Sequence, residues 1–307
     1  MPADDPTSRM HPSALSPVRC IWPAGARLGE GTLWSVREQA LYWVDILGRR
    51  LHRFDPASGA RLSWDFDEEI SAVAERARAP GLLVSLRHRF AFFDPATGAP
   101  PAELHRVAQE PPGNRFNDGK CDAQGRFWAG SMDFACVAPT GALYRLDPDG
   151  GCSRQAHGFA VTNGPAWSLD GRTLFLNDTV RRSVLAFDVD AASGTLSGQR
   201  TWLRFAAGDG FPDGMTTDAA GRLWIAHWGG GSVSCHDPVD ATELARIALP
   251  VSQVTDCCFG GPALRTLYVS SAAEGLDEDR RRAEPLAGGL FAVELDAEGL
   301  PAALFGG

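Results

Sequence analysis

The chain has 307 residues, of which 44% are hydrophobic and 22% charged, and its formal net charge is -9. This acidic balance argues against nucleic acid as the main partner and gives no support to binding of an anionic membrane, because both need a basic surface. No apolar run approaches the roughly 20 residues of a membrane span, so we expect a cytoplasmic protein with no membrane partner.

The cysteines do not form a recognisable framework. Seven are scattered along the chain without a CxxC spacing, which argues against a set of disulfides and against a structural zinc site. Cys257 and Cys258 are neighbours in sequence, so on a strand they point to opposite faces. We therefore expect reduced thiols.

The first 17 residues carry four prolines, start acidic and contain no apolar core. They do not resemble a signal peptide, and their composition predicts a disordered tail over residues 1–17. Residues 18–28, VRCIWPAGARL, are predicted to contain a short strand that belongs to no complete repeat of its own.

From Gly29 onward the same order of elements occurs six times. A polar start with a glycine leads into a short strand, a turn, a strand rich in Trp, Tyr, Leu and Phe, and a third strand that usually ends in an Asp-bearing turn. The polar starts, 41 to 50 residues apart, are Glu30, Ser71, Asp118, Asn163, Asp213 and Asp256. That interval is the period of a β-propeller blade.

The repeats predict one all-β domain over residues 18–304, although the length alone suggests two domains. This domain is a six-bladed β-propeller with four-stranded blades around a central channel. Helix is nearly absent, since no segment keeps an apolar period of 3.6. Residues 18–28 supply the outer strand of the last blade and close the ring.

The starts of the inner strands converge in this architecture, because all first strands run in the same direction along the axis. Glu30, Asn117, Asn163 and Asp213 lie at such starts, beside glycines that allow tight turns. Asp and Asn are also common turn residues, but a glutamate at the head of a buried strand needs a partner such as a cation. The pattern favours an oxygen-ligand cation site over turn formation.

Five motifs in register resemble the regucalcin (senescence marker protein)/gluconolactonase family. They are LGEGTLW, NRFNDGKCDAQGRFWAGSMD, TNGPAWSLDGRTLF, FPDGMTTDAAGRLWIA and CCFGGPALRTLYVS with PLAGGLFAV. The resemblance covers about residues 18 to 295, and the motifs are most similar to those of bacterial sugar lactone lactonases. It implies a six-bladed propeller with one divalent cation in the channel and a sugar lactone as the small-molecule substrate.

By this resemblance, Glu30, Asn163 and Asp213 bind the metal, and Arg115 and Asn117 contact the substrate. One position departs from the family's pattern. In the animal regucalcins a glutamate that contacts the sugar follows the AG-T/S-M strand, and the matching position here is about Ala135.

The resemblance implies hydrolysis of an aldonolactone, a sugar 1,4- or 1,5-lactone, to the aldonic acid. Three oxygen ligands leave open positions on a hard cation, and Asp213 is the candidate general base. Calcium, zinc, manganese, magnesium and ferrous iron all accept such ligands. No nucleophile elbow of the GxSxG type is present.

Three alternatives stay open. The first is a calcium-binding regulatory protein without catalysis. The second is a metal-dependent phosphotriesterase or esterase on the same fold. The third is a protein-interaction propeller, which would need no convergent Glu, Asn and Asp. We expect a monomer or a weak homodimer.

Overall fold

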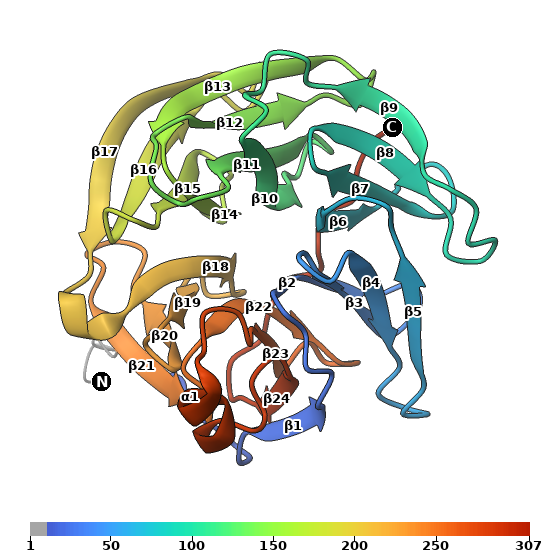
Figure 1. Cartoon of the computed structure of the whole chain (residues 1–307). Helices are drawn as coiled ribbons and strands as arrows, with labels where there is room; N and C mark the ends of the chain where they lie inside the picture. Colours follow the sequence, from blue (N-terminus) through green and yellow to red (C-terminus); the bar gives the residue numbers. More distant parts are fainter. Residues whose placement is uncertain (1–10) are drawn as a thin grey trace, which may run out of the picture.

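The computed structural model describes residues 11–307 and shows six antiparallel sheets arranged in a ring around a central axis (Figure 1). Each sheet has four strands, and its inner strand lies at the axis. Each of the six predicted polar starts lies in an inner strand. The predicted six-bladed propeller is therefore confirmed.

The first three blades follow one another along the chain, each from its inner to its outer strand. Blade one consists of β2 (Gly29–Ser35), β3 (Ala40–Asp45), β4 (Arg50–Phe54) and β5 (Arg61–Asp65). Blade two consists of β6 (Ile70–Glu75), β7 (Leu82–Leu86), β8 (Arg89–Phe93) and β9 (Ala102–Arg106). Blade three consists of β10 (Asn114–Cys121), β11 (Phe127–Asp133), β12 (Gly141–Leu146) and β13 (Cys152–Phe159).

The second half of the ring differs only in its last blade, which takes its outer strand from the other end of the chain. Blade four consists of β14 (Thr162–Trp167), β15 (Thr173–Asp178), β16 (Ser183–Val189) and β17 (Leu196–Arg204). Blade five consists of β18 (Phe211–Thr217), β19 (Leu223–Trp228), β20 (Ser232–His236) and β21 (Glu243–Ala248). Blade six consists of β22 (Val254–Gly260), β23 (Thr266–Ser271), β24 (Leu290–Glu294) and β1 (Arg19–Trp22).

The ring closes where β1 pairs antiparallel with β24, with Arg19 opposite Ala292. This confirms the role predicted for the segment before the first blade. Residues 11–17 continue along blade six: the Leu15 amide donates to the Glu294 carbonyl at 2.7 Å. The predicted disordered tail therefore falls into two parts, since residues 1–10 lie outside the described residues and residues 11–17 are hydrogen bonded.

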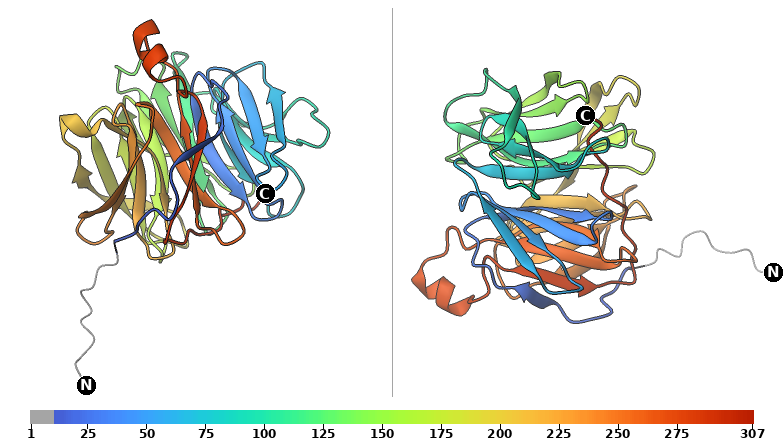
Figure 2. Two further views of the ribbon diagram at one scale, coloured as in Figure 1. Left: turned by 90° about the horizontal axis from the view of Figure 1, so that it is seen from below. Right: turned by 90° about the vertical axis from the view of Figure 1, so that its right-hand side faces the viewer.

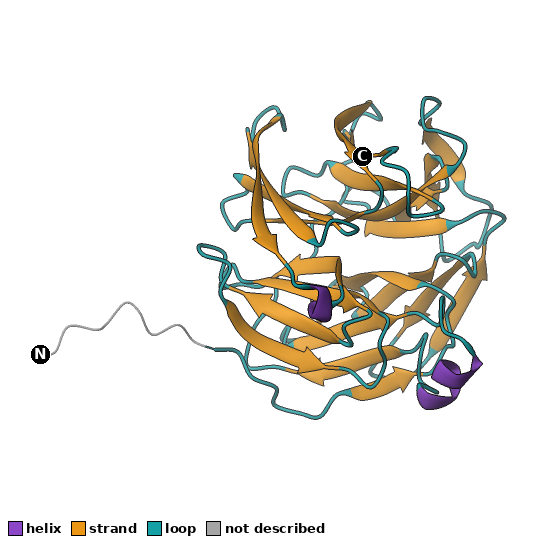
Figure 3. Ribbon diagram, turned by 60° about the vertical axis from the view of Figure 1, so that its left-hand side comes forward, coloured by secondary structure: helices purple, strands orange, loops and turns teal. Residues whose placement is uncertain are grey.

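Helix is confined to two short pieces within residues 11–307, as Figure 3 shows. They are the 3-10 turn η1 (Ala207–Asp209) and helix α1 (Glu278–Ala283). Asp277 caps the start of α1, because its side chain accepts from the Arg280 amide. Neither is long or apolar enough to cross a membrane.

The blades are held together by the aromatic second strands. Trp43, Trp128 and Trp224 are fully buried. Trp224 of blade five packs edge-on against Phe259 of blade six, with ring centroids 5.5 Å apart. Truncating such a tryptophan to alanine typically costs about 3–5 kcal/mol, so these residues are major contributors to the contact between blades.

Two blades use the same turn between their first and second strands, and the sequence repeat explains it. In blade three, Asp122 accepts from the Arg126 guanidinium at 2.6 Å and from the Trp128 indole at 2.9 Å. Asp218 of blade five accepts from the Trp224 indole at the same distance. The DAQGRFW and DAAGRLW stretches thus form equivalent turns, and in each the aspartate at the start holds the indole of the tryptophan at the end.

All seven cysteines are unpaired. Cys257 packs in the apolar cluster between blades five and six, whereas Cys258 packs in the cluster between blades six and one. The two neighbouring thiols therefore lie on opposite faces of β22, as predicted.

The last residues cross one end of the channel, a feature not predicted from the sequence. The Ala219 amide of blade five donates to the Glu298 carbonyl, and Phe305 forms a parallel bridge with Arg76 beside blade two. Phe305 is fully buried. Figure 2 shows the C-terminus on the face opposite helix α1, so this segment spans the mouth opposite the one where the inner strands begin.

Candidate metal centre

Every inner strand is irregular at its polar start or just after it. Register shifts break the ladder between Glu30 and Leu33, Ile70 and Ala72, Phe116 and Gly119, Asn163 and Ala166, Pro212 and Met215, and Val254 and Cys257. A bulge of this kind re-aims side chains and frees main-chain amides from the ladder. The six bulges therefore present polar groups to the axis at the mouth where the inner strands begin.

The predicted metal ligands are nearly enclosed: Glu30 and Asn163 are 3% exposed and Asp213 is 4% exposed. The pKa of Glu30 lies well above its usual value, mainly because the side chain is buried. The negative charges of Asp213, Asp256 and Asp118 raise it further. Burial, and then Asp118 and Asp256, likewise raises the pKa of Asp213, although a hydrogen bond with Glu30 opposes this. Two buried carboxylates in this state would be stabilised by a positive partner.

Asn163 has a defined orientation. Its Nδ2 donates to Thr179 Oγ1 at 3.0 Å, and Thr179 Oγ1 donates in turn to the Pro212 carbonyl at 2.8 Å. The amide oxygen Oδ1 accepts from Asn117 Nδ2 at 2.7 Å. Because its nitrogen is committed to Thr179, Asn163 offers its oxygen to the channel, as a ligand to a hard cation requires.

The predicted substrate residues adjoin this amide. Arg115 Nη1 donates to Asn117 Oδ1 at 2.6 Å and to the Phe116 carbonyl at 3.0 Å. Arg115 Nε is buried and has no hydrogen-bond partner among residues 11–307. Burial lowers the pKa of Arg115, and the charges of Glu30 and Asp213 are among those that oppose it. Arg115 thus keeps an unused donor beside the two carboxylates.

The loop after β11 contains the position that departs from the family's pattern. Phe134 is 41% exposed, and its ring lies 5.6 Å from Arg115 Cζ and 5.5 Å from Arg87 Cζ. The Phe134 amide donates to the Gly113 carbonyl at 2.9 Å, which fixes the loop. An aromatic ring next to Ala135 therefore stands over Arg115.

Other carboxylates near the mouth already have partners. Asp118 and Asp256 each lie 3.3 Å from Lys120 Nζ. Burial raises the pKa of Asp118 to about 6, an effect that Lys120 opposes. Asp133 accepts from two loop amides, and Asp178 accepts from Arg181 at 2.8 Å. Within residues 11–307 the Asp213 carboxylate forms no ion pair of this kind, and its hydrogen bond is with Glu30, so we take Asp213 as the better candidate base.

The charges at the axis do not cancel. Four carboxylates (Glu30, Asp118, Asp213 and Asp256) face two cations (Lys120 and Arg115), which leaves two negative charges if all six groups are ionised. No group of three or more His, Cys, Asp and Glu in the described part of the chain is arranged to hold a metal ion. The candidate set has two carboxylates and one amide oxygen, and its donors and charge suit one hard divalent cation.

Several residues of this site were not predicted. Asn177, whose Nδ2 donates to the Asp213 carbonyl, lies near the end of β15, and Thr179, which orients Asn163, directly follows that strand. Strand pairing was the available signal, because Asn163 lies opposite Asn177 in the antiparallel ladder. Residues at the end of a blade's second strand therefore lie beside the residues at the start of its first strand.

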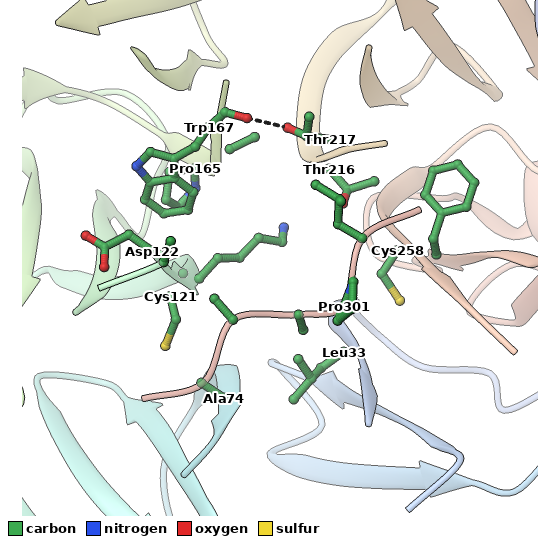
Figure 4. Close-up of a pocket in the computed structure, with 18 of the residues that line it drawn as sticks. Leu33, Ala74, Cys121, Asp122, Pro165, Trp167, Thr216, Thr217, Cys258 and Pro301 are labelled. Carbon is green, nitrogen blue, oxygen red and sulfur yellow. Dashed lines mark hydrogen bonds between the residues drawn. The ribbon is translucent and has the colours of Figure 1, made fainter. Parts of the chain in front are cut away.

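A cavity of about 310 Å³ lies at the opposite end of the channel (Figure 4). It is lined by Leu33, Ala74, Trp167 and Pro301 of the C-terminal segment. Asp118 and Lys120 also contribute to its lining. None of the five predicted site residues contributes to its lining. We place the candidate site at the other mouth, because the oxygen donors and the free Arg115 donor gather there.

These features define a class of protein: a six-bladed propeller with two carboxylates and an amide oxygen enclosed at one mouth of its channel. Residues 28–273 match the family described as the SMP-30/Gluconolactonase/LRE-like region. The chain belongs to this family, which confirms the resemblance inferred from the motifs.

Individual relatives match along nearly their whole length. The chain is 34% identical to regucalcin of Xenopus laevis, over 94% of this chain and 98% of that protein. It is 35% identical to the Bacillus subtilis protein named "Putative sugar lactone lactonase YvrE", over 92% and 96% of the two chains. Among solved structures, a calcium-binding protein, regucalcin, from Agrobacterium tumefaciens superposes with a TM-score of 0.89 at 29% identity, covering 94% and 96% of the two chains.

Proposed function

We propose that the protein hydrolyses an aldonolactone, a sugar 1,4- or 1,5-lactone, to the aldonic acid with the help of one divalent cation. Glu30, Asn163 and Asp213 would hold the cation through oxygen atoms. Such a cation supplies Lewis-acid polarisation of a carbonyl oxygen when bound. Calcium, zinc, manganese, magnesium and ferrous iron are all compatible with these ligands.

The protein's own groups divide the remaining work. Asp213 acts as the general base that takes a proton from the attacking water. Water adds to the lactone carbonyl carbon, the bond from that carbon to the ring oxygen breaks, and the ring oxygen takes up a proton. Arg115 Nε donates to an oxygen of the sugar. Asn117 Nδ2 already donates to Asn163 Oδ1 and to the Thr162 carbonyl, so Asn117 contacts the sugar through Oδ1, which accepts from a sugar hydroxyl. The low exposure of these residues keeps bulk water away from the reacting groups.

The observation that carries the proposal is the uncompensated charge at the axis. Two buried carboxylates with raised pKa values begin inner strands at the same mouth as an amide whose nitrogen is committed to Thr179 and a buried arginine with a free donor. A purely structural channel needs none of these groups. The relative named as a sugar lactone lactonase supports the choice of substrate.

A second candidate is a calcium-binding protein without catalysis, which the relatives named regucalcin favour. It shares the cation ligands with the lactonase. The two differ in what the Arg115 donor is for, because cation binding alone gives it no role. For either function we propose a cytoplasmic monomer or weak homodimer.

The test uses a panel of arabinono-, xylono-, galactono- and gluconolactone. Protein stripped of metal by chelation, and verified by elemental analysis, is assayed against the same protein reloaded with each candidate cation. Acid release is followed against an enzyme-free control, because lactones also open spontaneously. We expect turnover to be lost on stripping and restored by one cation per chain. Full turnover without metal would exclude the cation mechanism, and binding without turnover would favour the second candidate.

A further inference from the structure

Lys120 is the only lysine in the sequence, which also contains 28 arginines. It lies on β10 of blade three, and its amine reaches across the axis to blade six, on the opposite side of the ring. Lys120 Nζ lies 3.3 Å from Asp118 Oδ2 and 3.3 Å from Asp256 Oδ1. A lysine ammonium is a compact charge with three donors, whereas the planar guanidinium of arginine has a fixed fork. The site therefore suits lysine.

Both carboxylates bound by Lys120 also hold main-chain amides freed by the bulges. Asp118 Oδ2 accepts from the Gly164 amide at 3.0 Å. Asp256 Oδ2 accepts from the Thr32 amide and the Thr32 hydroxyl, each at 2.8 Å. Gly164 follows Asn163, and Thr32 lies two residues after Glu30.

Asp256 also meets the strand of the third candidate ligand. A Cβ placed on Gly214, the residue after Asp213, would lie 2.1 Å from Asp256 Oδ1. This close approach requires glycine at position 214 and fixes how near β18 lies to Asp256. The three residues Lys120, Asp118 and Asp256, which we call the axial triad, thus contact the strands that carry all three candidate ligands.

We propose that Lys120 is a positioning residue. By holding Asp118 and Asp256 in place, it fixes the amides of Gly164 and Thr32, and through them the strands that carry Asn163 and Glu30. The part that concerns catalysis rests on the proposed function, whereas the part that concerns the strands does not. Residues that orient the ligands of a metal without touching the metal commonly affect metal affinity or catalytic activity in this way.

Without Lys120, no ammonium would bridge the buried carboxylates of Asp118 and Asp256, and their negative charges would repel each other. The two side chains would turn apart or toward a cation at the ligand site, and either change weakens the bonds to Gly164 and Thr32. A pure charge effect predicts the opposite for metal binding. Removing Lys120 leaves one more negative charge at the axis, which alone would tighten the binding of a cation.

The matched variants are Lys120→Met and Arg126→Met. Both break an ion pair to a buried aspartate of blade three, but the Arg126–Asp122 pair serves a turn away from the ligand strands. The first measurement is amide hydrogen exchange in metal-free protein, so it does not depend on the proposed function. We expect Lys120→Met to speed exchange at Gly164 and Thr32 at least tenfold relative to Arg126→Met at matched stability. Equal exchange in the two variants would overturn the proposal.

The second measurement concerns the cation and the lactone. We expect Lys120→Met to weaken calcium or zinc binding, measured by calorimetry, by about 10- to 100-fold. Turnover at saturating cation should fall by a similar factor while KM stays nearly constant, because Arg115 and Asn117 are untouched. Lys120→Met combined with Asp118→Asn restores the net charge but not the bridge, so it should stay impaired. Recovery in this double variant, or tighter cation binding in Lys120→Met, would show that only charge matters and would overturn the positioning role.

If wild-type protein bound no cation, the proposed function would fail while the exchange result still decided the role of Lys120. If Lys120→Met did not fold, Asp256→Asn would replace it. That variant keeps an oxygen for Thr32 but loses the charge that attracts Lys120. It should again speed exchange at Gly164 and Thr32 relative to Arg126→Met, and unchanged exchange would again overturn the proposal.

Discussion

Replacing Asp213 by asparagine separates its role as a ligand from its role as a base. The substitution keeps an oxygen for a cation but removes a charge and the group that accepts the proton. The surroundings should stay in place, because the Asp213 carbonyl is held by Asn177 and the Pro212 carbonyl by Thr179. An asparagine can keep a hydrogen bond with Glu30 while removing one of the clustered negative charges, so the metal-free variant should be no less stable than wild type.

The loss of turnover can be bounded from the structure. General-base catalysis is typically worth about 10²–10⁴-fold in rate, which corresponds to about 3 to 5 kcal/mol of activation free energy. Asp118 and Asp256 are not ready to take over, because both are bound to Lys120, and Glu30 would be occupied as a ligand of the cation. We therefore expect Asp213→Asn to lower kcat at least 10²-fold.

The assay compares kcat at saturating lactone with bound cation measured on the same samples. Asp213→Asn reduces the uncompensated charge at the axis from two to one, so a large excess of cation is needed to fill the site. A variant with full occupancy and near-wild-type kcat would refute the reasoning and leave Asp213 as a ligand only. Asp118, Asp133, Asp178 and Asp256 would then be the next candidates for the base.

Asn117→Ala and Arg115→Ala should keep one cation per chain and reduce kcat/KM, by about 0.5–1.5 kcal/mol for a neutral hydrogen bond and more for the charged donor; loss of the cation in either variant would contradict this. Removing residues 1–17 should lower the thermal midpoint only slightly, because it breaks a few hydrogen bonds to blade six. Removing residues 1–28 should lower it far more, since β1 is lost and β24 becomes an open edge; equal midpoints would argue against ring closure by β1. Burial lowers the pKa of His227 to about 4, below its unfolded value of about 6.5, so its contribution to stability is present above pH 6.5 and is lost as the pH falls toward 4. His227→Gln should therefore flatten the loss of unfolding free energy in that range, and an unchanged slope would contradict the assignment.

The blade repeat could be predicted from the sequence because each blade carries its own local signals. The polar start, the turn and the aromatic second strand recur at a nearly constant interval, and strand pairing within a blade is set by neighbours in sequence. The same regularity placed Glu30, Asn163 and Asp213 at one mouth. Propeller geometry alone brings the starts of the inner strands together.

The remaining features depend on contacts between distant blades, for which the sequence has no period. Lys120 pairs with Asp256 across the whole channel, and the Gly164 amide becomes available only because a bulge removes it from the ladder. The path of the C-terminal segment to Arg76 depends likewise on the completed ring. Residues 11–17 show that a polar, proline-rich composition does not prevent local hydrogen bonding to a neighbouring strand.

The pairing of β1 with β24 has a consequence for how the chain folds during synthesis. Arg19 and Ala292 are partners although roughly 270 residues separate them. As the protein emerges from the ribosome, blades one to five can form in order, but the sixth sheet must recruit a strand made at the very beginning. Long-range pairing of this kind is slow, and until it forms, β24 exposes unpaired backbone groups. We expect the final, rate-limiting step of folding to be the docking of this first-made strand, with the open ring as the species most prone to aggregate.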